Sequence, residues 1–244
     1  MIGCNGGETP TEGLPAFVVD DRVAVDAGAL ARGLTLSEQA KLTHVLVTHA
    51  HLDHVRDIAL LLDARAQRGG APLVVCGTKA TLDVLKRDVF SGRLWPNFAK
   101  IPSKERPALL WQIIPTNKNV RIGKLDVRAV PVQHCEGAVG YVVGQGKTAF
   151  ACTGDTGPTT AFWKEVERDP RFPIRVTVQF YQATATGQVT GEQMAHLAAT
   201  VGQVYAKGDF VGSLVVPEGW LADQGPQNLG DARPDAKRFH QRSV

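Results

Sequence analysis

The sequence contains few cysteines, and their spacing does not pair them. Cys4, Cys76, Cys135 and Cys152 are far apart in a chain of 244 residues. Because there is no CxxC pair and no dense cysteine framework, the sequence disfavours both a cysteine-based metal site and a disulfide-stabilised secreted domain. It indicates instead four buried free thiols in a reducing compartment.

Long apolar runs and a strong net charge are also missing. No apolar stretch approaches the ~18 residues of a membrane-spanning helix, and no basic segment followed by an apolar one marks a signal peptide. We therefore expect a cytoplasmic protein without a membrane partner, although residues 1–4 resemble the inside of a strand, which would fit a missing upstream segment. The net charge of +3 is small and evenly spread. It predicts no nucleic-acid partner but is compatible with a small anionic substrate.

The composition is that of an ordinary globular chain, with 43% hydrophobic and 21% charged residues. Apolar runs separated by turn residues predict strands, and 3.6-residue periodicity predicts helices outside a mixed sheet. The expected strands are 15–19, 23–26, 44–48, 73–76, 111–114, 125–132, 138–143, 148–152 and 174–180, and the expected helices are 36–42, 54–68, 78–88 and 160–168. Residues 91–106, rich in aromatic residues and proline, are expected to form a loop.

The character of the chain changes after Thr177, where the glutamines concentrate. A helix over 191–200 and a strand over 210–216 are expected there. Residues 1–223 are interpreted as one hydrolase domain. Residues 224–244 are interpreted as a polar tail in loop or disordered conformation.

The densest chemical signal is the run Thr48-His49-Ala50-His51-Leu52-Asp53-His54, which holds three of the seven histidines. An expected strand ends at Thr48 and an expected helix follows, so the chain turns sharply at this point. His49 and His51 are two residues apart in extended backbone and project to the same side. Imidazoles with a carboxylate suit Zn, Mn or Fe, and two adjacent half-sites suit a two-metal hydrolase. The alternative is a cluster of surface histidines at a strand–helix turn.

Three further residues stand where strands end. His134 follows the apolar strand that closes with Pro131-Val132-Gln133 and is a candidate ligand, the alternative being an ordinary polar residue. Asp155 lies between two glycines, which permit close approach of the backbone to a metal. Asp26 is expected to support a ligand or loop through hydrogen bonds, with a simple turn-forming role as the alternative.

Together these motifs resemble the metallo-β-lactamase superfamily, and more narrowly the class II cyclic-nucleotide phosphodiesterases. The narrower resemblance covers residues 2–176. The segments that carry it are Gly3-Cys4-Asn5-Gly6-Gly7, the His51-to-Asp57 run, Trp95-Pro96-Asn97-Phe98 with Ile101-Pro102, Val130-Pro131-Val132-Gln133-His134, Val139-Gly140-Tyr141 and Thr153-Gly154-Asp155-Thr156-Gly157-Pro158.

The resemblance implies an α+β fold, a four-layer αββα sandwich with a dinuclear site at one edge and an atypical or incomplete C-terminal part. It implies two divalent ions, Zn with Mn or Fe as alternatives. One ion would be bound by His49, His51 and His134, the other by Asp53 and His54, with Asp155 bridging them. A metal-bridging hydroxide would hydrolyse 3′,5′-cyclic AMP or GMP to the nucleoside 5′-monophosphate, with Asp53 and His54 as catalytic residues.

The chain departs from the family pattern after Thr177. The family continues with a Ser-Gly-His segment and a His-x-Lys-Pro segment whose histidine completes the second metal site, and neither is present. The histidines that remain downstream are His196, in a helix-like segment, and His240, in a charged tail. A shifted reading frame or a replaced C-terminus would explain the change and would weaken the second site.

Two other interpretations of the sequence stay open. The chain could be another hydrolase of the superfamily, such as an RNA-processing phosphodiesterase, although it lacks a basic glycine-rich RNA-binding insertion. It could also be a metal-binding homologue whose catalysis is impaired by the altered C-terminus.

Overall fold

The N-terminal half of the chain builds a sheet from segments that are mostly joined by helices. The computed structural model describes residues 1–157, 159–171, 175–179 and 214–215. Within these residues the first sheet runs in sequence order. Its strands are β1 (Phe17–Val19), β2 (Val23–Val25), β3 (His44–Leu46), β4 (Leu73–Gly77) and β5 (Leu109–Ile113). β1 and β2 are antiparallel, whereas β2 to β5 pair in parallel, which requires the long connections between them.

The second sheet is largely an antiparallel meander. Its described strands are β6 (Asn119–Ile122), β7 (Leu125–Pro131), β8 (Val139–Gln145), β9 (Thr148–Cys152), β10 (Arg175–Gln179) and β11 (Leu214–Val215). β6 to β9 pair as antiparallel neighbours, and β10 pairs in parallel with both β9 and β11. The carboxyl ends of β7 and β9 therefore lie at the same edge of the sheet.

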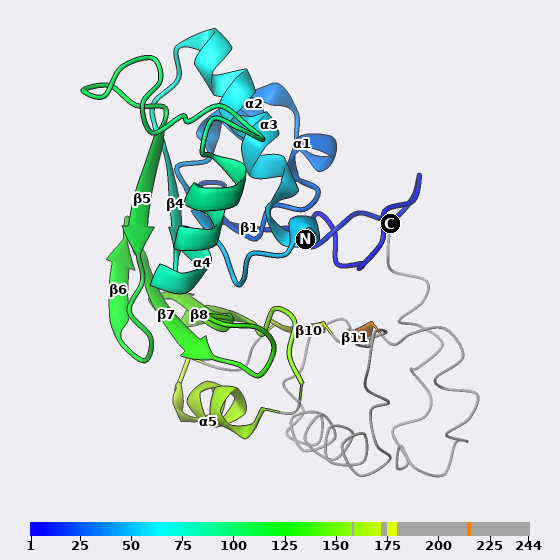
Figure 1. Cartoon of the computed structure of the whole chain (residues 1–244). Coiled ribbons are helices and arrows are strands. Elements are labelled where there is room, and N and C mark those ends of the chain that lie inside the picture. Colours follow the sequence, from blue (N-terminus) through cyan, green and yellow to red (C-terminus); the bar gives the residue numbers. More distant parts are fainter. Residues whose placement is uncertain (158, 172–174, 180–213, 216–244) are drawn as a thin grey trace.

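Helices cover the outer faces of both sheets. They are α1 (Leu30–Gly33), α2 (Leu36–Lys41), α3 (Leu52–Arg68), α4 (Lys79–Val84), which continues as the π-helical turn η1 (Leu85–Val89), and α5 (Thr160–Arg168). Figure 1 shows α1 to α4 beside the first sheet and α5 on the far side of the second. The predicted αββα sandwich is therefore confirmed.

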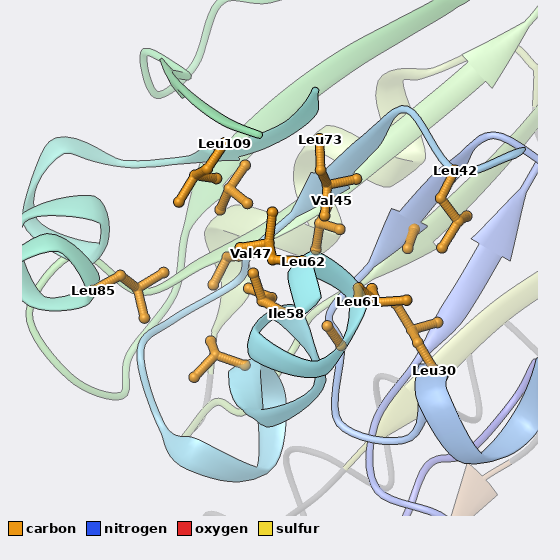
Figure 2. Close-up of a cluster of buried hydrophobic side chains, with 14 of the residues drawn as sticks. Leu30, Leu42, Val45, Val47, Ile58, Leu61, Leu62, Leu73, Leu85 and Leu109 are labelled. Atoms are coloured by element: carbon orange, nitrogen blue, oxygen red, sulfur yellow. The ribbon is translucent and has the colours of Figure 1, made fainter. Parts of the chain in front are cut away.

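Three buried clusters hold these layers together. The first lies between the first sheet and its helices, where Leu61 and Leu62 of α3 pack over Val45 and Val47 (Figure 2). The second lies between the two sheets and includes Leu46, Tyr141 and Cys152, and the third packs Phe162, Trp163 and Val166 of α5 against the second sheet. Burying apolar surface in three successive layers is what a four-layer sandwich requires.

The two sheets are also joined by hydrogen bonds close to the end of β3. The hydroxyl of Tyr141, fully buried in β8, donates to the carbonyl of Val47 at 2.9 Å. The backbone N–H of Val139 donates to the carbonyl of Thr48 at 3.0 Å. These two bonds fix the second sheet against the segment that leads into the histidine-rich run.

Most of the expected elements are present, and the differences occur where the sequence signal is weak. The helix expected from His54 begins at Leu52, two residues earlier. The short helix α1 and the edge strand β6 were not predicted, because α1 has one turn and only Ile122 of β6 is buried. β11 falls inside the strand expected at 210–216, whereas the expected helix 191–200 and the expected tail 224–244 lie outside the described residues.

Candidate metal centre

The histidine-rich run lies between the end of β3 and the first turn of α3. His51 is the N-cap residue of α3; it has extended backbone angles (φ −70°, ψ 148°), and its side chain makes no capping hydrogen bond to the helix. Asp53 lies in the first turn, where a carboxylate interacts favourably with the helix dipole. His49 and His54 are fully buried, whereas His51 is exposed. The strand–helix junction therefore directs all four side chains toward one region.

Asp26 supports this junction from the end of β2. Its backbone adopts the left-handed conformation (φ 57°), which aspartate tolerates better than most residues. One carboxylate oxygen accepts the backbone N–H of Thr48 at 2.8 Å, and the other lies 2.7 Å from Nδ1 of His54. Asp26 is fully buried. The hydrogen bonds expected of Asp26 are thus present, and they join β2, β3 and α3.

The second sheet contributes His134 and Asp155 from the ends of β7 and β9, the two strands that flank β8. The loops after β7 and β9 are joined by a hydrogen bond from the Gly157 N–H to the Gln133 carbonyl, at 2.6 Å. Gly154 has φ 58°, and a Cβ at this position would lie 2.8 Å from Cβ of Thr48. Position 154 therefore requires glycine for two reasons: its left-handed backbone angle and its close contact with Thr48 beside the first sheet.

The six predicted ligands form two donor groups that share one carboxylate. The first group is His49, His51, His134 and Asp155, and the second is Asp53, His54 and Asp155; in each group the candidate ligand atoms lie within 4.8 Å of one another. In the first group, His51 Nδ1 lies 3.0 Å from His49 Nε2 and 3.1 Å from His134 Nε2. In the second, His54 Nε2 lies 3.2 Å from Asp155 Oδ1 and 3.6 Å from Asp53 Oδ2.

The surroundings set opposite protonation tendencies for the two buried histidines. Burial, together with the neighbouring imidazoles of His54, His134 and His51, lowers the pKa of His49 to about 2. Burial also acts to lower the pKa of His54, but the carboxylates of Asp26 and Asp155 outweigh it and raise that pKa to about 10. His49 is thus a neutral imidazole with a lone pair to offer, whereas a cation at the second group would replace the proton of His54.

The donor set fits divalent transition metals. Three imidazole nitrogens with a carboxylate match the nitrogen and oxygen ligands preferred by Zn, and also suit Mn and Fe. A carboxylate shared by two adjacent groups matches the usual arrangement of two-metal hydrolases, in which the ions lie ~3.5–4 Å apart. The four cysteines stay free, and none belongs to either donor group. The cluster is therefore a candidate metal centre.

One residue of this centre was not singled out from the sequence. Thr48 is buried, and its hydroxyl lies among Asp26, His49 and His54. Its place directly before His49 was the available signal, but only the fold brings Asp26 to it. His196 and His240, the remaining downstream histidines, lie outside the described residues.

Comparison with known families gives a direct match. The profile of the beta-lactamase superfamily domain matches residues 21–207, more than half of the chain. The chain belongs to the metallo-β-lactamase superfamily. The superfamily match includes β2 to β10 and the whole candidate centre, and it continues past residue 177, where the narrower resemblance to the phosphodiesterases ends.

Curated relatives of this superfamily member are phosphodiesterases by name. The chain is 27% identical over 116 residues to the probable 3′,5′-cyclic-nucleotide phosphodiesterase of Yersinia pestis, a match covering 46% of the chain. It is 31% identical over 80 residues, 33% of the chain, to the 3′,5′-cyclic-nucleotide phosphodiesterase of Schizosaccharomyces pombe. These matches span 32% and 22% of the relatives' own lengths. The relationship to these phosphodiesterases is therefore distant.

Solved structures show the metallo-β-lactamase fold. The chain is similar to unliganded yeast PDE1, with a TM-score of 0.62 and 16% identity, covering 88% of each chain. It is also similar to the short form of human tRNase Z, with a TM-score of 0.54 and 14% identity, covering 82% of this chain and 86% of the other. In the described part of the chain, none of the helices has the length and hydropathy to cross a membrane.

Proposed function

We propose that this metallo-hydrolase cleaves 3′,5′-cyclic nucleotides to nucleoside 5′-monophosphates with two bound divalent ions. The observation that carries the proposal is the pair of donor groups sharing Asp155. Such a pair suits in-line displacement at a phosphate, because it can neutralise charge on both the attacking and the leaving oxygen. The substrate class is taken from the matched relatives, which are named 3′,5′-cyclic-nucleotide phosphodiesterases.

Each predicted ligand has a defined place in this proposal. His49, His51 and His134 would hold the first ion, Asp53 and His54 the second, and Asp155 both. When bound, the ions lower the pKa of a coordinated water and neutralise charge on the phosphoryl oxygens. We propose zinc for both positions, with manganese or iron as alternatives that the same ligands accept.

Asp53 and His54 carry the proposed acid–base work. The side chain of Asp53 is 30% exposed and lies 3.6 Å from His54 Nε2, so it is open to solvent while facing the second donor group. It can therefore orient the attacking water and accept its proton. His54 is fully buried and held by Asp26, so that its Nε2 keeps a constant direction toward Asp155.

Assays of the metal-loaded protein test this proposal. Purified protein supplied with Zn, Mn or Fe should convert cyclic AMP or cyclic GMP to the 5′-monophosphate, and a chelator should abolish the conversion. Bis(p-nitrophenyl) phosphate reports general diesterase activity, and precursor tRNA reports the RNA-processing alternative. Cleavage of precursor tRNA alone would replace the proposed substrate. Bound metal without turnover of any substrate would identify an impaired homologue.

Metal counting tests the altered C-terminus separately. Two tightly held ions per chain would contradict the hypothesis that a shifted frame or replaced segment after residue 177 weakens the second site. One ion, held by the first donor group, would support it. His196→Ala and His240→Ala should each leave the metal content unchanged, because neither histidine is proposed as a ligand.

The extent of the domain is also a proposal. We propose that residues 1–223 form the hydrolase domain and that 224–244 are an appended polar tail. Limited proteolysis should then remove the tail and leave a metal-binding fragment. Early cleavage between residues 119 and 179 would contradict this division, because it would cut inside the second sheet.

A further inference from the structure

Thr48 lies where the support from Asp26 meets the metal ligands, yet it is not itself a candidate ligand. Only 1% of its surface is exposed. Its hydroxyl oxygen lies 3.0 and 2.9 Å from the two carboxylate oxygens of Asp26, and 3.1 Å from Nδ1 of His49. The hydroxyl therefore contacts a carboxylate on one side and an imidazole nitrogen on the other, in a space closed to bulk water.

The number of available protons determines which group is the donor and which the acceptor in each of these contacts. A hydroxyl has one proton to donate, and an ionised carboxylate has none. The Thr48 proton must therefore go to Asp26, and the Thr48 oxygen faces His49 with its lone pairs. His49 Nδ1 can complete this contact only by donating a proton. The same reasoning makes His54 Nδ1 a donor, since it lies 2.7 Å from Asp26 Oδ2.

The result is a proton on Nδ1 of both buried histidines, reached by two different routes. A neutral imidazole protonated at Nδ1 carries its lone pair on Nε2. Nε2 of His49 lies 3.0 Å from His51 Nδ1 in the first donor group, and Nε2 of His54 lies 3.2 Å from Asp155 in the second. Asp26 reaches His54 directly but is linked to His49 through the hydroxyl of Thr48.

Gly154 holds Thr48 in place from the second sheet. A Cβ on Gly154 would lie 2.8 Å from Cβ and 2.9 Å from Oγ1 of Thr48, so the glycine backbone packs directly against the threonine side chain. This contact restricts the rotation that would turn the hydroxyl away from Asp26 and His49. The direction of the hydroxyl is therefore fixed by packing as well as by hydrogen bonds.

We propose that Thr48 is a positioning residue that fixes His49 in the tautomer whose Nε2 lone pair faces the first donor group. Its effect on metal affinity rests on the proposed function of the site, whereas the tautomer itself can be measured without any metal. Removal of a hydrogen-bond partner that orients a ligand histidine typically costs about 10- to 100-fold in metal affinity. The loss should fall on the first ion, because His54 keeps its direct contact with Asp26.

Three variants separate the hydroxyl from the shape of the side chain. Thr48→Val keeps the branched shape and removes the hydroxyl, and Thr48→Ser keeps the hydroxyl and removes a methyl group. Thr43→Val is the matched control, because the Thr43 hydroxyl donates to the Arg22 carbonyl outside the site. Nitrogen-15 NMR of histidine-labelled, metal-free protein reports the tautomer, and competition with a zinc indicator reports affinity.

The expected pattern is specific to a tautomer-setting role. The parent protein, Thr48→Ser and Thr43→Val should show His49 protonated at Nδ1, whereas Thr48→Val should show a mixture and bind its first zinc ion about 10- to 100-fold more weakly. A parent His49 protonated at Nε2 would overturn the proposal, even if Thr48→Val does not fold. Unchanged zinc affinity in a folded Thr48→Val variant would also overturn it. Absence of cyclic-nucleotide turnover with the expected tautomers would reject only the proposed function.

Discussion

The two sheets contribute to the candidate metal centre in different ways. The first sheet supplies Asp26 and a compact run from Thr48 to His54, joined by hydrogen bonds between short elements. The second supplies His134 and Asp155, single residues at the ends of β7 and β9. One half is built by local sequence, the other by packing of distant strands. The half of the centre that comes from the first sheet should therefore keep its geometry when a change disrupts the half that comes from the second sheet.

The largest effect should follow removal of the residue that belongs to both donor groups. Asp155→Asn removes the shared charge, and we expect loss of at least one ion and about a 10³-fold fall in kcat. Metal stabilisation of transition-state charge is worth several kcal/mol, and each 1.36 kcal/mol is tenfold in rate. The measurement is metal content together with steady-state turnover.

Asp126→Asn is the control for this change. Asp126 also lies in the second sheet, where it forms a surface ion pair with Arg121 at 2.7 Å, and surface ion pairs contribute little to stability. This variant should keep its metal and its activity. Equal behaviour of Asp155→Asn and Asp126→Asn would mean that Asp155 does not link the two groups.

A smaller effect is expected from changing the support in the first sheet. In Asp26→Asn, the amide oxygen can still accept from Thr48, but the amide nitrogen would face His54 Nδ1 and force its proton onto Nε2. That proton would occupy the direction of the second ion, so zinc affinity there should fall about 10- to 100-fold. Competition titrations with a zinc indicator would measure this loss of zinc affinity.

The matched control for this change is Asp21→Asn. Asp21 also has a left-handed backbone (φ 52°), but it lies exposed in the turn between β1 and β2. It should bind zinc as the parent does. If Asp26→Asn binds both ions as tightly as Asp21→Asn does, the carboxylate of Asp26 does not set the direction of His54.

The contact between the two halves can be tested with a pair of glycines. Gly154 and Gly146 both have φ 58°, but a Cβ at Gly154 would collide with Thr48, whereas at Gly146 it would meet nothing within 4 Å. Both alanine variants should incur ~1–2 kcal/mol from the left-handed backbone, and Gly154→Ala a further ~1–3 kcal/mol from overpacking. Urea unfolding measures both. Equal losses of stability would show that Thr48 moves aside freely.

The smallest effect should come from the hydrogen bond between the sheets. Tyr141→Phe removes the bond to the Val47 carbonyl and should lower the free energy of unfolding by ~1–3 kcal/mol. Burial raises the pKa of the Cys76 thiol to about 12 and that of Cys152 still higher, so both thiols should resist alkylation while the sheets stay together. Pulsed alkylation should label these two cysteines faster in Tyr141→Phe.

Thr148→Val serves as the control, because it removes an exposed hydroxyl of β9 that donates to the carbonyl of Gln145. Its labelling rate should match that of the parent. An unchanged rate in Tyr141→Phe would show that the apolar layer alone keeps the sheets together.

The contrast between the two halves also explains what could be predicted from sequence. His49, His51, Asp53 and His54 were found directly, because three scarce histidines within six positions are a dense local signal. His134 and Asp155 were weak signals taken singly, and their selection rested on their places at strand ends together with the histidine-rich run upstream. The remaining contacts of the site join residues that are far apart in the chain, so the local sequence carried no signal for them.

Contacts made through space account for what the sequence did not reveal. The hydrogen bonds from Thr48 to Asp26 cross 22 positions, and the contact of Gly154 with Thr48 crosses between sheets. Such contacts leave no periodic pattern in the chain. The same reason applies to β6, which pairs with its neighbour β7 although only one of its own four residues, Ile122, is buried.

The position of Asp155 at the end of β9 has a consequence for the order of events during synthesis. Translation releases Asp26 and the histidine-rich run first, His134 much later and Asp155 last. A nascent chain can thus fold its first sheet and orient His49 and His54 while neither donor group is complete. High-affinity metal capture must wait until β9 has joined the second sheet, so a bound ion would mark a chain whose two sheets have already come together.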